Sequence, residues 1–388
     1  MKRQETTETA LFVSQTAEKG GAELFMLDLI THGPAGWNGG FFADGTIVQD
    51  LAAAGCKPVV LSGGSSVLTV RREASALKLV SVAGGVVTLA RALARAAKDY
   101  DVVCANSQKA LFVSALATRL ARRPLVWVLH DIITDPAFSR NTRRAAVLFA
   151  NLFAARVVAN SRASAEAFVA AGGKADRVRI VYCGFDPAAH PQGDAETGAA
   201  LRRRFGLKDG PVVGLFGRLT PWKGQHVLLK ALRGVPDVQA LIVGSAMFGQ
   251  DAYEVELRQM VRTEGLEGRV CFAGFQKDVA ALMAGVDIVV HTSTHAEPFG
   301  RVVVEGMLAG RPVIATSGGG VNEIVTEGED GLLVSPDDPA ALAAAISRLL
   351  ADPDLAARLA AAGRISAARR FHIDKTCGDM RAVLAEVR

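Results

Sequence analysis

Short apolar runs recur along the whole chain, and longer segments with helical spacing separate them. In the first half the runs are ALFVS (10–14), PVVLS (58–62), DVVCA (101–105), LVWVL (125–129), RVVA (156–159) and RIVY (179–182). In the second half they are PVVGLF (211–216), ALIVG (240–244), VCFAG (270–274), DIVVH (287–291), PVIA (312–315) and GLLV (331–334). Continuous apolar strands that alternate with helices are typical of parallel sheets covered on both faces. We therefore expect an α/β chain with two Rossmann-like domains.

The segment 184–210 divides the two series of strands. It contains two prolines and a polar run, a composition typical of a linker. We expect an N-terminal domain over 1–186 and a C-terminal domain over 187–370. Open parallel sheets bind ligands beyond the carboxyl ends of their strands, so the two sheets are expected to face a central crevice that holds the chemistry.

The Ala- and Leu-rich tail, 338–388, has helical spacing throughout. We expect three helices there, with breaks at Asp352-Pro353 and at Gly363, because Pro and Gly interrupt helical patterns. The last helix, over 371–388, is expected to pack back on the N-terminal domain.

Composition narrows the class of protein. The chain has 388 residues, of which 50% are hydrophobic and 21% are charged. No stretch reaches the roughly 18 apolar residues of a membrane span, and the first residues lack the apolar core of a secretory signal, so we expect a cytoplasmic protein. The five cysteines are odd in number and form no C-x-x-C pair, which favours neither a disulfide framework nor a zinc cluster.

Positive charge is concentrated in the first half. Residues 1–190 contain 22 Lys and Arg against 15 Asp and Glu, whereas residues 191–388 contain 22 against 24. This asymmetry favours an anionic partner for the first domain, either a phosphorylated acceptor or the inner face of an anionic membrane, and not a nucleic acid. The basic groups in question are Arg71-Arg72, Arg91/Arg95/Lys98, Arg119/Arg122/Arg123 and Arg140/Arg143/Arg144. An ordinary solvated surface is the alternative.

The segment GRLTPWKG (217–224) follows the first apolar run of the second half. Gly217 and Gly224 let the backbone turn close to a ligand, while Arg218 and Lys223 bring two cations to a strand-to-helix corner. Together with the free N–H groups at the start of the next helix, these cations suit a diphosphate. An exposed basic turn is the alternative.

The segment EPFGRVVVE (297–305) provides two carboxylates. A helix is predicted to begin near Gly300, which places Glu297 at its start and Glu305 about a turn and a half along it. Backbone amides of Phe299 to Arg301 can hold an anion or sugar hydroxyls, and a carboxylate further on can accept both hydroxyls of a ribose. Alternatively, the two carboxylates only complement the helix dipole and face solvent.

Three other patterns are less specific. Gly318-Gly319-Gly320 either lets backbone amides approach a phosphate or forms a flexible loop. Asp99-Tyr100-Asp101 matches the metal-binding D-x-D pattern but precedes its strand, which favours a helix-to-strand turn. His291 and His295 leave a strand and do not share a helix, which disfavours a zinc pair. No metal is therefore expected.

The order of GRLTPWKG, HTSTHAEPFGRVVVEGMLAGRPVIATSGGGVNEIV and EDGLLVSPDDPAALAAAI resembles the retaining glycosyltransferases of family 4, which have the GT-B fold. The E-x7-E pair, Glu297 and Glu305, is the most diagnostic motif of that family. The similarity extends to Gly20-Gly21-Ala22-Glu23, His130-Asp131 and ANSRAS (159–164), and thus covers nearly the whole chain.

The resemblance implies a role for each motif. In the donor-binding domain, Gly217, Arg218 and Lys223 would hold the donor diphosphate, and Glu305 would hold the ribose. Glu297 and the backbone of Phe299, Gly300 and Arg301 would hold the transferred sugar.

In the other domain, the Gly20-Gly21 turn would approach the phosphate or the acceptor. His130 would contact the sugar near the reacting carbon, as a hydrogen-bond donor or as part of the pocket wall. A buried structural histidine is the alternative for His130.

The expected function is a metal-independent, retaining hexosyltransferase without a cofactor. It would move a sugar from a donor such as a UDP- or GDP-hexose to a hydroxyl acceptor, in polysaccharide, cell-envelope or glycoconjugate assembly. The acceptor hydroxyl would attack from the side of the leaving phosphate and lose its proton to it. The alternatives are a natural-product glycosyltransferase and, from another class, a catalytically silent nucleotide-sugar-binding protein.

Overall fold

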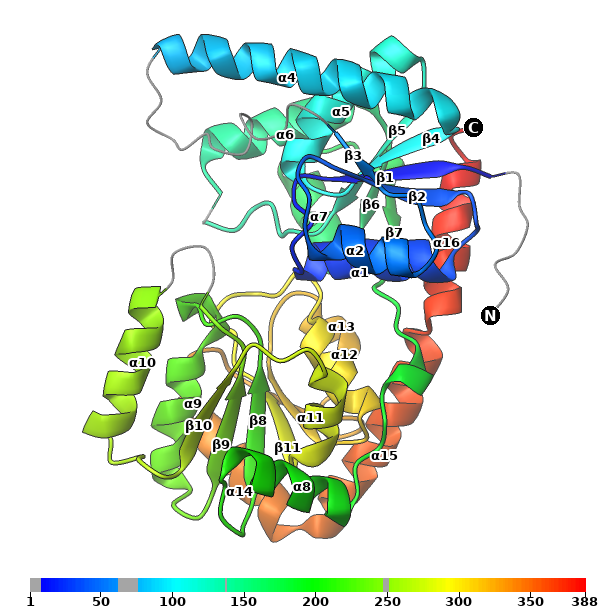
Figure 1. Cartoon of the computed structure of the whole chain (residues 1–388). Coiled ribbons are helices and arrows are strands. Elements are labelled where there is room, and N and C mark those ends of the chain that lie inside the picture. The colour runs from blue at the N-terminus through cyan, green and yellow to red at the C-terminus, as the bar shows by residue number, and fades with distance from the viewer. Residues whose placement is uncertain (1–7, 62–75, 137, 247–250) are drawn as a thin grey trace. The chain divides into compact units, whose positions relative to one another are not determined.

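The computed structural model describes residues 8–61, 76–136, 138–246 and 251–388 (Figure 1). The chain forms two compact units, one of Met1–Gly184 with Ile373–Arg388 and one of Phe185–His372. Each unit is built on one parallel sheet, which confirms the α/β class with two Rossmann-like domains. The chain passes from the first unit to the second after Gly184 and returns to the first unit after His372. Each crossing lies two residues from the boundaries expected at 186 and 370.

The sheet of the first unit has seven described strands in the order β3-β2-β1-β4-β5-β6-β7. The strands are β1 (Ala10–Ser14), β2 (Trp37–Phe41), β3 (Val59–Val60), β4 (Val102–Ala105), β5 (Leu125–Leu129), β6 (Ala154–Ala159) and β7 (Val178–Ile180). Strand order reverses between β1 and β4, which is where open α/β sheets bind ligands. Every residue of β1, β4 and β5 is buried, as expected for central strands covered on both faces.

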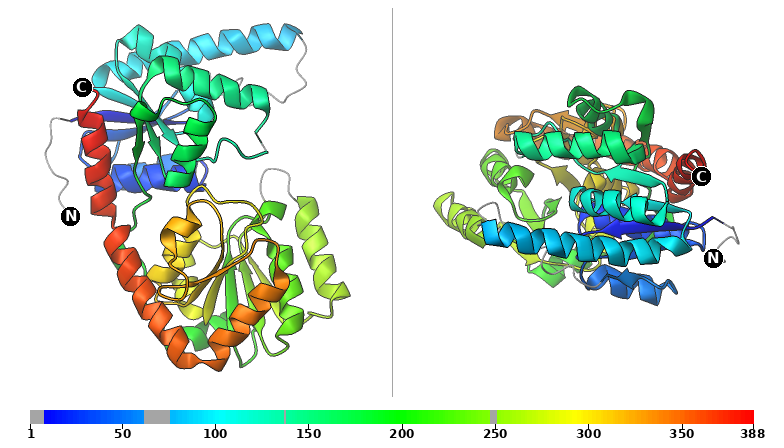
Figure 2. Two further views of the ribbon diagram at one scale, coloured as in Figure 1. Left: turned by 180° about the vertical axis from the view of Figure 1, so that it is seen from behind. Right: turned by 90° about the horizontal axis from the view of Figure 1, so that it is seen from above.

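Helices cover both faces of this sheet, with α4, α5 and α6 on one face and α1, α2 and α16 on the other (Figure 1). Their bounds are α1 (Gly21–His32), α2 (Thr46–Ala53), α4 (Ala76–Ala96), α5 (Gln108–Ala121), α6 (Arg140–Phe153), α7 (Arg162–Ala170) and α16 (Ile373–Ala385). Helix α5 packs between α4 and α6, and the three run side by side (Figure 2, right). The C-terminal helix α16 packs against α1 of the same unit.

The sheet of the second unit has six described strands in the order β10-β9-β8-β11-β12-β13. The strands are β8 (Val212–Phe216), β9 (Gln239–Val243), β10 (Val270–Gly274), β11 (Ile288–His291), β12 (Val313–Thr316) and β13 (Leu332–Val334). The order repeats that of the first six strands of the other sheet. Its reversal therefore lies between β8 and β11, the two strands that precede the candidate motifs.

The second unit has eight described α-helices, of which five connect its strands. The eight helices are α8 (Ala195–Phe205), α9 (Gln225–Ala231), α10 (Asp251–Thr263), α11 (Val279–Gly285), α12 (Arg301–Leu308), α13 (Val321–Ile324), α14 (Pro339–Ala351) and α15 (Pro353–Arg370). In the part of the chain that the structure describes, we find no helix with both the length and the apolar character needed to cross a bilayer.

Two sequence-based expectations about elements were wrong. Strand β2 was missed because its sequence, WNGGF, contains two glycines, although the strand pairs with β1 over its full length. The tail does not break at Gly363, which lies inside α15; a Cβ there would lie 2.8 Å from the Asp330 carbonyl oxygen. The glycine thus lets α15 pack closely against the loop before β13, and the break after α15 falls at Phe371. The break at Asp352-Pro353 is confirmed, since Asp352 caps α15.

Candidate functional site

The loops after β8, β11 and β12 meet at the carboxyl edge of the second sheet, because these three strands are neighbours. Thr292 Oγ1 donates to the Lys223 carbonyl at 2.9 Å, and the Thr294 amide donates to the Trp222 carbonyl at 2.8 Å. Gly224 has a φ of +69°, and a Cβ there would lie 1.9 Å from the Thr292 carbonyl oxygen. Gly224 is therefore needed so that the GRLTPWKG loop can lie against the loop after β11.

This packing brings Lys223 and Glu297 together, although 74 residues separate them. Lys223 Nζ donates to Glu297 Oε1 and lies 4.1 Å from the centre of the Trp222 ring. His291 Nε2 and Ser293 Oγ reach the same carboxylate oxygen at 3.1 Å and 2.5 Å. One buried oxygen thus takes three contacts, while the described residues make no hydrogen bond to Glu297 Oε2.

These contacts control the charge of Glu297. Burial alone raises the pKa of its carboxyl, but the charge of Lys223 and the hydrogen bond and charge of His291 act against it. The net effect holds the pKa of Glu297 well below its ordinary value. Glu297 is therefore an ionised, oriented hydrogen-bond acceptor and not a proton donor.

Arg218 lies on the same loop, and its side chain is exposed. Its carbonyl accepts from Nε2 of Gln225 at 2.8 Å, and Gln225 is fully buried. Helices α9, α12 and α13 begin from Gly224, Gly300 and Gly320 without a side-chain cap. Some first amides of α9 and α13 are nevertheless paired: the His226 amide donates to Tyr253 Oη at 3.4 Å, and the Asn322 amide donates to the Gly319 carbonyl at 3.3 Å. The start of α12, the longest of the three helices, is therefore the one best suited to bind an anion or hydroxyl groups.

Glu305 lies on α12, four residues after Arg301, the first residue of that helix. Arg301 Nη2 lies 3.6 Å from Glu305 Oε1, and its guanidinium stacks over the Phe185 ring at 4.5 Å. The predicted helix start near Gly300 is correct. Gly300 has a φ of +110°, a conformation that strongly favours glycine.

Two of the three amides of the glycine triplet are paired within the second unit. The Gly320 amide donates to the Glu297 carbonyl at 2.8 Å, and the Gly318 amide donates to Asn322 Oδ1 at 2.9 Å. A Cβ on Gly319 would lie 2.1 Å from the Glu297 carbonyl oxygen. The glycines therefore let this loop pack against the backbone at Glu297.

The carboxyl edge of the first sheet carries Gly20-Gly21 after β1 and His130 after β5. A Cβ on Gly20 would lie 2.8 Å from Glu23 Oε2, so a side chain there would displace this carboxylate. Glu23 is buried, and its Oε1 accepts from Ser14 Oγ at 2.9 Å. Gly20 begins α1 without a side-chain cap.

His130 is connected to the glycine turn through Asn106. Asn106 is fully buried; its Nδ2 donates to the Ala22 carbonyl at 2.9 Å, which turns Oδ1 toward His130 Nε2 at 2.8 Å. An amide oxygen only accepts, so His130 Nε2 carries a hydrogen and donates. The Phe25 ring meets the imidazole edge to face at 5.2 Å. Burial, together with the charge of Asp135, raises the pKa of the adjacent Asp131 to about 6.

The carboxylate of the D-x-D segment has a structural role. Asp101 precedes β4 and accepts from the amide and the hydroxyl of Thr9, both at 3.0 Å, and from Arg388 Nη2 at 2.7 Å. Asp101 thus links the segment before β1 to the C-terminal residue Arg388 at the amino edge of the first unit's sheet. Within the described ranges, no group of three or more His, Cys, Asp or Glu is placed to hold a metal ion.

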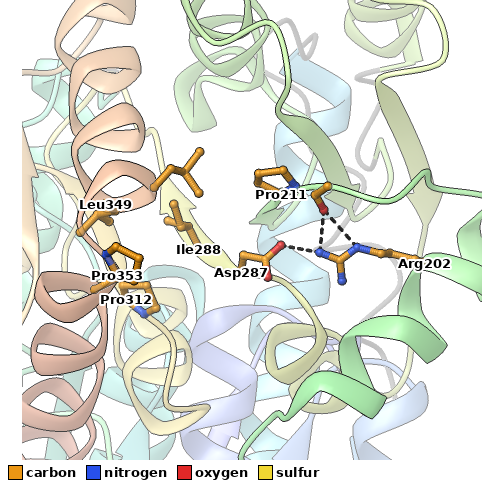
Figure 3. Close-up of a pocket in the computed structure, with 10 residues that line it drawn as sticks. Arg202, Pro211, Asp287, Ile288, Pro312, Leu349 and Pro353 are labelled. Atoms are coloured by element: carbon orange, nitrogen blue, oxygen red, sulfur yellow. Dashed lines mark hydrogen bonds and ion pairs between the residues drawn. The ribbon is translucent and has the colours of Figure 1, made fainter.

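A cavity of about 470 Å³ lies at the opposite edge of the second sheet, where β8, β11 and β12 begin (Figure 3). Arg202 spans it: the Nη2 atom contacts Asp287 Oδ2 and the Gly210 carbonyl, both at 2.7 Å. These contacts pair the two charged residues that line the cavity, Arg202 and Asp287, with each other. We therefore assign this cavity a structural role and place the functional site at the carboxyl edge.

The sequence-based reasoning missed three side chains of the two edges and rejected a fourth. Gln225 and Asn106 orient backbone and histidine, and Ser293 contacts Glu297. His291 had been considered only as half of a zinc pair, but it contacts Glu297, whereas His295 is exposed. The available signal was a polar residue at the end of an otherwise apolar strand, six residues before Glu297.

Two Rossmann-like units, one of which carries the cluster of Lys223, His291 and Glu297 at the carboxyl edge of its sheet, have the architecture of the GT-B fold. The family profile of the glycosyl transferases group 1 matches residues 199–366, and that of glycosyltransferase family 4 matches residues 46–189. The D-inositol 3-phosphate glycosyltransferase of Acidothermus cellulolyticus is 33% identical over 312 residues, which are 74% of this chain and 68% of that protein. This chain belongs to the group 1 glycosyltransferases of family 4.

Two further similarities add detail. The crystal structure of Anabaena Alr3699/HepE in complex with UDP and glucose has a TM-score of 0.88 and 38% identity, and the match covers 97% of this chain and 99% of that one. The alpha-D-kanosaminyltransferase of Streptomyces kanamyceticus is 31% identical over 277 residues, 66% of this chain and 69% of that protein.

Proposed function

We propose that the protein transfers a hexose from a UDP-hexose to a hydroxyl acceptor, with retention of anomeric configuration and without a metal ion. The observation that carries this proposal is the cluster of Lys223, His291 and Glu297 beside the start of α12. The 38% identical relative crystallised with UDP and glucose supports UDP-glucose as the first donor to test.

In this proposal the second unit holds the donor. Arg218 and Lys223 bind the diphosphate, with Gly217 in the same turn, and Glu305 binds the ribose hydroxyls. Cations at the phosphate stabilise the charge that develops on the leaving group, so they lower the barrier as well as bind the donor. Lys223 must then exchange part of its contact with Glu297 for the phosphate.

The sugar contacts follow from the second carboxylate oxygen of Glu297. This Oε2 accepts from a sugar hydroxyl, and the amides of Phe299, Gly300 and Arg301 provide donors next to it. The first unit contributes the Gly20-Gly21 turn and His130. Because His130 Nε2 already donates to Asn106, that nitrogen is not a general base.

In the proposed reaction the leaving phosphate takes the acceptor proton on the face of the sugar from which it departs, which gives retention. An inverting transferase needs a base on the opposite face of the sugar. The test is an NMR time course with UDP-glucose and acceptor in excess EDTA. We expect the first product to keep the donor's anomeric configuration, and an inverted product or a strict need for Mg²⁺ or Mn²⁺ would contradict the proposal.

The acceptor is proposed to be a lipid-linked or other glycan of polysaccharide or cell-envelope assembly, and a small natural product is the alternative. Parallel assays with a polyprenyl-linked sugar and with soluble small-molecule alcohols distinguish the two. Slow hydrolysis of UDP-glucose without acceptor separates an enzyme from a silent binding protein, because a silent protein leaves the donor intact.

A lipid-linked acceptor agrees with a surface on the first unit. Neither α5 nor α6 contains an Asp or Glu, and both carry exposed leucines among arginines. The exposed fractions are 56% for Leu120, 55% for Leu148 and 62% for Leu152. Basic and apolar groups together bind the interface of an anionic membrane. Of the basic groups expected at this contact, Arg71-Arg72 lies outside the described residues.

Vesicle flotation tests this contact. We expect the protein to float with anionic vesicles at low salt and not with neutral ones. Replacing Leu148 and Leu152 together by Ser should abolish flotation, whereas Ile365→Ser, at a residue 69% exposed in the other unit, should leave it unchanged. No flotation of the unmodified protein at low salt excludes the contact.

A further inference from the structure

His291 lies between a carboxylate and a hydroxyl group, and these two partners determine which of its ring nitrogens carry a hydrogen. Its Nε2 lies 3.1 Å from Glu297 Oε1, and its Nδ1 lies 3.3 Å from Thr316 Oγ1. The imidazole is buried, and it belongs to the last residue of β11, next to β12 in the sheet. Its position is therefore fixed by the central strands.

Each partner limits what the ring can do. An ionised carboxylate only accepts, so Nε2 must donate a hydrogen to Glu297. Thr316 has one hydroxyl hydrogen, which it gives to the Ser293 carbonyl at 2.8 Å. Thr316 Oγ1 can therefore only accept from Nδ1, so that nitrogen also carries a hydrogen.

We propose that His291 is an imidazolium that serves as the permanent counter-ion of Glu297 and holds its Oε2 toward the sugar. This inference rests on the proposed function, in which Lys223 binds the donor diphosphate. Lys223 and Glu297 form an ion pair without donor, and Lys223 turns toward the phosphate when donor binds. His291 then keeps Glu297 ionised and in place, because a buried carboxylate without a partner is strongly destabilising.

His291 is thus a positioning residue: it acts through Glu297 and need not touch the donor. The arrangement also explains why the cluster has two cations for one carboxylate. The ionisable groups that face the imidazole in the described residues are Glu297 and, through the same oxygen, Lys223. The surplus positive charge is matched by the phosphates of the donor.

The protonation state is tested on the full chain without ligand. In a nitrogen NMR spectrum of protein labelled in its histidines at pH 7, we expect His291 to show two protonated ring nitrogens. The signal is assigned by its loss in His291→Gln, and His295→Gln, at an exposed histidine in the same loop, should leave it in place. Glu297→Gln should convert His291 to a neutral ring. An unprotonated nitrogen in the unmodified protein overturns the proposal.

A double-mutant cycle tests the counter-ion role through UDP affinity measured by calorimetry. His291→Gln should weaken UDP binding about tenfold, because Lys223 can no longer leave Glu297 at low cost. In a Glu297→Gln background the same change should cost less than about twofold, since no carboxylate needs a counter-ion. A merely structural role of His291 predicts equal losses in the two backgrounds, and equal losses overturn the proposal.

The two proposals fail in distinguishable ways. If neither the unmodified protein nor His295→Gln binds UDP, the proposed donor is wrong, while the NMR experiment still decides the state of His291. If His291→Gln does not fold, the Glu297→Gln spectrum and the loss of the signal in His291→Asn carry the same test.

Discussion

The carboxyl edges of the two sheets have the same strand order but opposite electrostatics. In the second unit, Lys223 and His291 hold the pKa of Glu297 below its ordinary value in spite of burial. In the first unit, burial and Asp135 raise the pKa of Asp131 to about 6. One edge thus stabilises charge, and the other disfavours it. The difference comes from the side chains that each edge collects, because the topology is shared.

Several helix starts at the two carboxyl edges also differ. In the first unit α5, α6 and α7 are capped by Ser107, Ser139 and Ser161, each of which accepts from a first-turn amide. In the second unit α9, α12 and α13 begin from glycines without such a cap. Capping stabilises a helix but occupies the amides that would bind an anion. The division is not complete, because α1 of the first unit begins from Gly20 without a side-chain cap and α11 of the second unit is capped by Asp278.

The largest expected effect is that of Glu297→Gln on turnover. The substitution keeps the shape but removes the ionised acceptor that is proposed to hold the sugar, so kcat for transfer should fall on the order of 100-fold or more. UDP should bind at least as tightly as before, because Lys223 loses its competing partner. Steady-state kinetics and UDP calorimetry measure the two quantities. A parallel loss of kcat and UDP affinity would contradict the assignment of Glu297 to the sugar.

Much of this edge was accessible from the sequence. The E-x7-E pair and the GRLTPWKG loop identified Glu297, Glu305, Arg218 and Lys223 because both segments follow apolar runs that form adjacent strands. The direct contact between Lys223 and Glu297 was not accessible, since it depends on how Gly224 packs against the loop after β11. Similarly, the role of His291 depends on the pairing of β11 with β12, which places Thr316 beside it.

Two local errors have the same cause. Gly39 and Gly40 made strand β2 hard to predict, and Gly363 suggested a helix break. The reason is that a sequence alone does not show whether a glycine ends an element or allows close packing within it. A Cβ on Gly39 would meet the Phe41 ring at 2.7 Å and Leu51 at 2.8 Å, so this strand uses glycine to bring α2 close. Such packing is long-range and leaves no periodic signal.

The next largest effect separates the two cations of the second edge. Arg218→Ala and Lys223→Ala should each weaken UDP binding about 10- to 100-fold, since a charge-assisted hydrogen bond contributes roughly 1.5–3 kcal/mol. Only Lys223→Ala should also lower the melting temperature clearly, because it removes a partner of a buried carboxylate, whereas Arg218 is exposed. Equal melting temperatures for the two variants would show that the Lys223–Glu297 pair adds no stability.

The smallest expected effect tests the other edge through Asp131→Asn. In the folded protein the pKa of Asp131 is about 6, against roughly 3.9 in an unfolded chain. Between these values the folded protein keeps a proton that the unfolded chain has lost, so this residue reduces the free energy of unfolding as pH rises from about 4 to about 6, and the reduction persists above. Partial exposure screens the charge, which leaves an effect on the order of 1 kcal/mol.

The amide introduced by the substitution cannot ionise, so the variant should melt a few degrees higher than the unmodified protein at pH 7.5 and at the same temperature at pH 4. Asp135→Asn is the matched control and should give a smaller gain of the same sign, because it removes the secondary cause and leaves burial. Calorimetric scans at the two pH values measure both, and a lower melting temperature of Asp131→Asn at pH 7.5 would mean that the charged form of Asp131 stabilises this edge.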